Sequence, residues 1–108
     1  MPVLTIGNHQ AGVPVKVTPS GLSCALLVVL TKDAGGTEIV STSNQPVFTS
    51  TGSSQTVNAS INIPSSASGT LYVFVDVYVN GILVGIFPQG SDNAIEIPGV
   101  TIGPIIWT

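Results

Sequence analysis

Apolar and polar residues alternate at every second position along almost the whole chain. The apolar residues within 13–17 and within 57–63 are each separated by one other residue. A period of two is the pattern of a β-strand with one buried face. No stretch combines a helical period with residues that cap a helix. The sequence therefore predicts an all-β protein.

The predicted strands are short and are separated by residues that favour turns. Clusters of Gly, Pro, Asn and Ser end a strand about every eight to twelve residues, which gives roughly eight to ten strands. The last two are expected at residues 94–97 and 100–107. A chain of 108 residues has the size of one domain. We predict a single domain over residues 1–108, an antiparallel two-sheet β-sandwich of the immunoglobulin-like type, with a jelly roll as the alternative.

The most apolar stretch, residues 22–30, predicts a central strand. Both of its alternating faces are largely apolar, as expected for a strand covered on both sides. The stretch is too short for a membrane-spanning helix, which needs about 20 residues. Cys24 lies within it and is the single cysteine of the chain. We expect it to be a small buried hydrophobe without an internal disulfide.

The most specific local pattern predicts a β-hairpin over residues 71–87. Asn80-Gly81 is a preferred pair for a two-residue type I′ turn, in which both residues need a positive φ. A regular register from this turn pairs Val79 with Ile82, Val77 with Val84 and Val75 with Ile86. We expect this β-branched face to belong to the core.

The opposite face of the hairpin is rich in aromatic residues. The same register pairs Tyr78 with Leu83, Asp76 with Gly85 and Phe74 with Phe87, with Tyr72 beyond them. Two interpretations of Asp76 stay open: a charge that keeps an exposed sheet soluble, or a polar contact within a binding or packing surface. Because aromatic residues are enriched at interfaces, this face is a candidate contact surface.

Charged residues are scarce, and this argues against several classes of function. They make up 6% of the chain, with two lysines and no arginine, against about 25% in an average domain. Two lysines cannot form the basic surface that binds nucleic acid. The single histidine, His9, has no nucleophile motif around it and is expected in a surface loop; metal-ligand spacings and glycine-rich phosphate loops do not occur. We expect no enzymatic activity, no cofactor and no nucleic-acid partner.

Strands rich in Thr, Val and Ile, scarce charge, and termini rich in Pro and Gly occur together in this chain. In these features it resembles the immunoglobulin-like β-sandwich subunits of archaeal and viral surface assemblies, such as virions, filaments and pili. The resemblance implies a structural protein that self-assembles, with other copies of itself as partners. It also implies an extracellular or virion location, although the chain start lacks the features of a signal peptide.

The two ends of the chain, residues 1–10 and 98–108, are candidate assembly segments. Both contain short β-prone stretches, and the second is apolar near its end, where chain ends are usually polar. Either the ends pair within their own domain as edge strands, or they add to a neighbouring subunit. The predicted interface residues are apolar or aromatic apart from one carboxylate: Tyr72, Phe74, Asp76, Tyr78, Leu83, Phe87, Ile105, Ile106 and Trp107.

The alternative function is a module that binds carbohydrate or a cell surface. Aromatic side chains beside polar groups form sugar-binding platforms, and the aromatic face around Asp76 supplies a modest version. Asn58-Ala59-Ser60 matches the N-glycosylation motif, which makes Asn58 a candidate modification site. Glycans or a host surface are the partners that this alternative implies.

Overall fold

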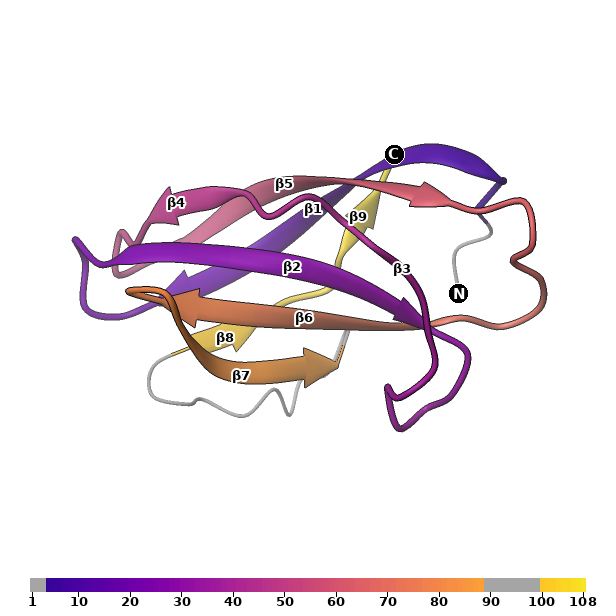
Figure 1. Cartoon of the computed structure of the whole chain (residues 1–108). Helices are drawn as coiled ribbons and strands as arrows, with labels where there is room; N and C mark the ends of the chain where they lie inside the picture. The colour runs from indigo at the N-terminus through magenta and orange to yellow at the C-terminus, as the bar shows by residue number, and fades with distance from the viewer. Residues whose placement is uncertain (1–3, 89–99) are drawn as a thin grey trace.

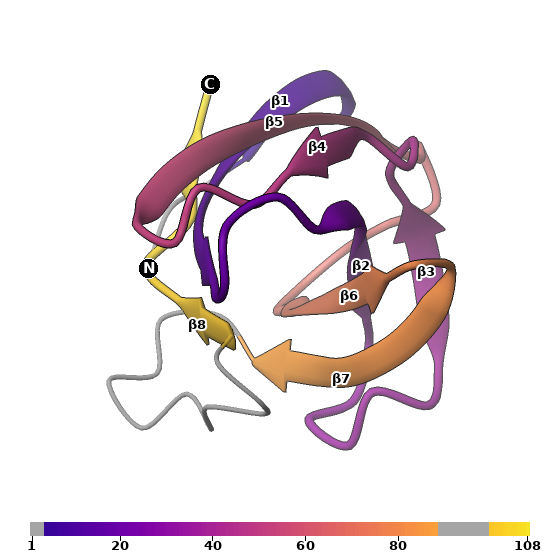
Figure 2. The ribbon, with the colours of Figure 1, turned by 90° about the vertical axis from the view of Figure 1, so that its left-hand side faces the viewer.

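The structure is a computed structural model that describes residues 4–88 and 100–108. Within these residues every regular element is a β-strand, and the strands form two antiparallel sheets that pack face to face (Figures 1 and 2). The predicted all-β sandwich is confirmed. The strand predicted at residues 94–97 lies outside the described residues, as do parts of the two end segments, 1–10 and 98–108.

The first sheet is centred on the longest strand, β1 (Gly7–Val17). β1 pairs along most of its length with β5 (Ser54–Ile63). Two short strands, β8 (Val100–Ile102) and β9 (Ile106–Trp107), also pair with β1. The C-terminal segment therefore pairs within its own domain, which is the first of the two interpretations of the chain ends.

The second sheet is centred on β2 (Ser23–Thr31) and β6 (Tyr72–Val79), which pair with each other. β7 (Ile82–Pro88) continues the sheet beyond β6. Both β3 (Ile39–Thr42) and β4 (Val47–Thr49) pair with the other side of β2. β2 therefore has neighbours on both sides, which confirms the central strand predicted from residues 22–30.

The core between the sheets is built from the inward-facing alternate residues of the long strands. The largest of its fully buried aliphatic side chains are Val13, Val15, Val17, Leu26, Leu30, Val28, Val75, Val77 and Ile102. The alternate positions of β5 also face inward, as its pattern predicts. Cys24 is buried among them, and burial raises the pKa of its thiol. This position fits the predicted role of a small hydrophobe.

The two sheets are joined along one side by hydrogen bonds from the segment between β3 and β4. Ser43 is buried there; its Oγ accepts from Val28 N at 2.8 Å and donates to Asn44 O at 2.6 Å. Asn44 N donates to Ser60 O of β5 at 3.0 Å, and its Oδ1 accepts from Ser60 N at 2.8 Å. These bonds fasten one side of the second sheet to β5.

The hairpin turn is as predicted, but the register beyond it is not. Asn80 and Gly81 have φ angles of 51° and 78°, as a type I′ turn requires. From the turn outward, the observed pairs are Val79–Ile82, Tyr78–Leu83, Val77–Gly85, Asp76–Ile86, Val75–Phe87 and Phe74–Pro88. The first two match the prediction. The other four differ from it by one residue on β7, because a β-bulge interrupts the pairing after Tyr78.

This shift exchanges the two faces of β7 beyond the bulge. A slip of one residue moves every following side chain to the other face of a sheet. Phe87, predicted on the outer side, is therefore in the core and 2% exposed, whereas Ile86, predicted in the core, is 58% exposed. Gly85 makes room for the ring, since a Cβ there would lie 2.7 Å from Phe87 Cζ.

Candidate functional site

One broad side of the second sheet points away from the core and is largely apolar. Residues that pair across neighbouring strands share a face, and this pairing groups side chains from β4, β2, β6 and β7, which lie side by side (Figure 1). We call this surface the outer face; it consists of Ala25, Leu27, Val47, Phe74, Asp76, Tyr78, Leu83 and Ile86. Val47, Ile86 and Leu83 are 82%, 58% and 45% exposed. Exposed apolar side chains gathered on one surface mark contact sites in soluble proteins.

Asp76 lies at the centre of the outer face. It pairs with Leu27 on one side and with Ile86 on the other. The five strands of this sheet contain no other charged residue. No hydrogen-bonding or charged partner stabilises the carboxylate within the described part of the chain, and partial burial raises its pKa above the ordinary value. The face therefore carries a single charge in an apolar setting.

The structure brings together some of the predicted interface residues and separates others. Phe74, Asp76, Tyr78 and Leu83 lie on the outer face. Phe87 does not, because the bulge in β7 turns it into the core. Sequence reasoning missed Ile86, Leu27 and Val47 as members of this face. Ile86 was missed because the predicted register of β7 was wrong. Leu27 and Val47 join the face only through the pairing of β2 with β6 and of β4 with β2.

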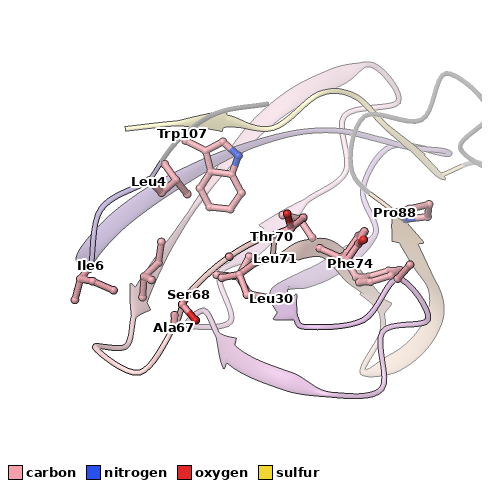
Figure 3. Close-up of a pocket in the computed structure, with 15 residues that line it drawn as sticks. Leu4, Ile6, Leu30, Ala67, Ser68, Thr70, Leu71, Phe74, Pro88 and Trp107 are labelled. Carbon is pink, nitrogen blue, oxygen red and sulfur yellow. The ribbon is translucent and has the colours of Figure 1, made fainter.

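A second feature is a pocket of about 620 Å³ at one end of the sandwich, lined by residues from both sheets. In Figure 3, Leu4 and Trp107 lie on one wall, and Leu30 and Leu71 lie on the other. Among the residues that the structure describes, none that lines this pocket is charged. Its volume is within the range of small-molecule sites, which are also mainly apolar. We call it the end pocket.

The end pocket also unites aromatic residues from distant parts of the sequence. Tyr72 and Phe74 from β6 and Trp107 from β9 all line it. The sequence marks all three as candidate contact residues but gives no sign that they share a site. They meet because β9 pairs with β1, where Trp107 lies opposite Ala11.

The C-terminal tail is fixed to its own sheet. Ile105 is 8% exposed and belongs to the core, while Ile106 is 61% exposed. Thr108 N donates to Gln10 O at 2.9 Å, and Gln10 N donates to Thr108 O at 3.2 Å. Of the three predicted interface residues in the tail, Ile105, Ile106 and Trp107, Ile106 is the most exposed, since Trp107 is half-buried at the end pocket.

His9 is part of strand β1 and not of a surface loop, so that expectation is wrong. Its Nε2 lies 2.7 Å from Thr5 O, and its Nδ1 lies 3.1 Å from Thr108 O. The ring of His9 thus connects the segment before β1 to the C-terminal tail, and we assign it a structural role. In residues 4–88 and 100–108, no three His, Cys, Asp or Glu side chains lie close enough together to hold a metal ion.

Asn58, the candidate glycosylation site, is exposed on β5. It lies in the middle of the strand, opposite Gly12 of β1. Ser60, the third residue of the motif, is exposed on the same face and opposite Gln10. The asparagine side chain is therefore open to solvent, although the backbone around it is part of a paired strand.

Comparison with protein-family models, with curated proteins and with solved structures gave no match. The part of the chain that the structure describes has no helix long and apolar enough to cross a membrane. The function must therefore be argued from the two features built above, the outer face and the end pocket.

Proposed function

We propose that this chain is a non-enzymatic structural subunit that self-associates through its outer face, as part of a virion, a filament or another extracellular layer. The observation that carries the proposal is the set of exposed apolar side chains on neighbouring strands of the second sheet. The scarcity of charge supports it: with a net charge of −3, copies repel each other only weakly.

The outer face offers a free energy of the size that association needs. Full burial of a Val, Leu or Ile side chain is worth about 1.5–3 kcal/mol. Val47, Leu83 and Ile86 are 45–82% exposed, so a symmetric contact that covers them on both copies gains roughly 5–10 kcal/mol. Association itself costs about 4–15 kcal/mol. The two are comparable, so we expect self-association that depends on protein concentration.

Sedimentation of the full chain at increasing concentration, at neutral and acidic pH, tests this proposal. Ile86→Gln replaces an exposed apolar side chain beside Asp76 by an uncharged polar one and is expected to give a folded chain that associates more weakly. Ile106→Gln is the matched control, because Ile106 is similarly exposed but lies on the first sheet. Far-UV circular dichroism verifies that both variants fold. A wild-type chain that stays monomeric at millimolar concentration at both pH values would refute self-association.

The end pocket favours a second candidate function, a module that binds an uncharged sugar or apolar group. The features that support this alternative are the aromatic residues in its lining and the absence of charge among the described lining residues. Trp107 is the chain's single tryptophan, so its fluorescence reports directly on the pocket. Saturable quenching by a glycan or by a neutral aromatic probe, lost in the pocket-filling variant Ala67→Phe, would favour a binding module over a subunit.

For the finer fold type we favour a variant of the immunoglobulin-like sandwich over a jelly roll. If the interrupted pairs β3–β4 and β8–β9 each count as one strand, the described strands number seven, three in one sheet and four in the other. Seven is the number in a constant-type immunoglobulin domain, and a jelly roll has eight. In a constant-type domain the second and third strands belong to different sheets. Here β2 pairs with β3 and β4, which together take the place of the third strand, so the fold would be a variant of that type.

A further inference from the structure

The outer face carries a negative charge at its centre, and none of the strand residues that form it carries a positive charge that could neutralise it. The neighbouring strands β2 and β7 contribute no charged or acidic group beside Asp76, and β6 itself contributes only the phenols of Tyr72 and Tyr78. Three charged residues, Lys32, Asp33 and Glu38, lie in the segment that connects β2 to β3. The other lysine, Lys16, lies on β1 in the first sheet.

Any partner that covers the outer face must therefore neutralise the Asp76 carboxylate or bury it as an unpaired charge. The lysines of a second copy do not supply a cation to this contact, because Lys16 lies on β1 of the first sheet and Lys32 follows the end of β2, outside the outer face. A twofold axis through the centre of the face would place the two Asp76 side chains close together. Burial of unpaired charge is costly, and two neighbouring carboxylates favour a shared proton. Protonation removes both costs.

We propose that the partner of the outer face is a second copy of this chain, docked face to face with Asp76 protonated, so that acidification drives the association. This inference rests on the proposed function. The size of the molecule supports a face-to-face dimer. Each partner contributes about 800 Å² to a standard interface, and the broad side of a molecule of 40 × 23 × 23 Å can supply that area.

The direction of the pH effect follows from proton linkage. In the free chain, burial among Leu27, Ile86 and the aromatic rings already raises the Asp76 pKa above 3.8. A second copy would bury the carboxyl further and raise its pKa again. The associated form then binds more protons than the free form as the pH falls towards the free-chain pKa. The association constant is therefore expected to rise by up to tenfold per pH unit for each proton taken up.

Sedimentation equilibrium of three full chains, from about pH 7.5 to about pH 4.5, tests this proposal. The variants are the wild type, Asp76→Asn and the control Glu38→Gln, which removes an exposed carboxylate outside the outer face. Asparagine has nearly the shape of the protonated acid without its charge. We expect wild-type association to strengthen at least tenfold on acidification, and Asp76→Asn to associate at neutral pH as strongly as the wild type does in acid. Glu38→Gln should follow the wild type.

The outcomes separate this inference from the proposed function. Wild type and Asp76→Asn that associate equally at every pH would overturn the role of Asp76 and leave self-assembly standing. If both stay monomeric throughout, both proposals fail. If Glu38→Gln gains as much as Asp76→Asn at neutral pH, the effect is one of net charge, and the role of Asp76 is refuted. Circular dichroism at each pH shows that the compared chains are folded.

Discussion

Replacement of Phe87 by alanine should destabilise the domain strongly, whereas replacement of its neighbour Ile86 should have little effect. These residues are neighbours on β7, but the β-bulge places Phe87 in the core at 2% exposure and Ile86 on the surface at 58%. Truncation of a buried Phe to Ala typically costs 3–5 kcal/mol, a large share of the roughly 5–15 kcal/mol that stabilises a small domain. An exposed residue truncated to Ala usually changes stability by about 0.5 kcal/mol or less.

Gly85 provides an internal check on the same geometry. A Cβ at this position would lie 2.7 Å from Phe87 Cζ, so Gly85→Ala should cost about 1–3 kcal/mol through overpacking. That cost depends on the ring. Once Phe87 is itself alanine the added methyl group has room, so the double variant should be more stable than the sum of the single effects predicts.

Urea unfolding followed by circular dichroism measures all four variants under one condition. The reasoning predicts that Phe87→Ala loses several kcal/mol, that Ile86→Ala loses little, and that Gly85→Ala and Phe87→Ala are coupled. A regular register would reverse the order of the first two variants and abolish the coupling. Equal losses for Ile86→Ala and Phe87→Ala would also refute the bulge as described.

Three further predictions concern the turns and the tail. Asp33 accepts hydrogen bonds from Glu38 N and Thr37 N, which lower its pKa to about 2. Because the pKa is depressed, the ionised carboxylate stabilises the fold fully above the ordinary pKa of 3.8, and this effect is lost as the pH falls through about 2. The two amide resonances should titrate with a midpoint at about pH 2 in NMR spectra. Asn80→Ala should cost about 1–2 kcal/mol in urea unfolding, since alanine tolerates the observed φ of 51° poorly; no loss would contradict the type I′ turn. Ile105→Ala should cost about 2–5 kcal/mol because the side chain is buried, and a negligible loss would show that the tail is not part of the core.

The sequence predicts strands best where one face is polar. In β5, apolar and polar residues alternate strictly, so a single assignment of the buried face is consistent with the pattern, and it is confirmed. In β7, the residues ILVGIFP are apolar on both faces, so a slip of one residue leaves the pattern unchanged. The bulge that reverses Ile86 and Phe87 therefore has no signature in the alternation.

The candidate sites depend on contacts that local patterns do not contain. The aromatic side of β6 could be predicted from the chain alone, including the position of Asp76 between Phe74 and Tyr78. The extent of the outer face could not, because Val47 joins it only through the pairing of β4 with β2. The end pocket is lined by both Tyr72 and Trp107, which are far apart in the sequence. Trp107 takes its place there because β9 pairs with β1.

The account as a whole claims that copies of this chain meet through the outer face around Asp76. Carbodiimide labelling of carboxyl groups, read by mass spectrometry, tests that claim most directly when dilute and concentrated samples are compared at one mildly acidic pH. The account predicts that concentration protects Asp76 from labelling and leaves Glu38, which is exposed outside the outer face, unchanged. An associated sample in which Asp76 is labelled as fast as in the dilute monomer would contradict it.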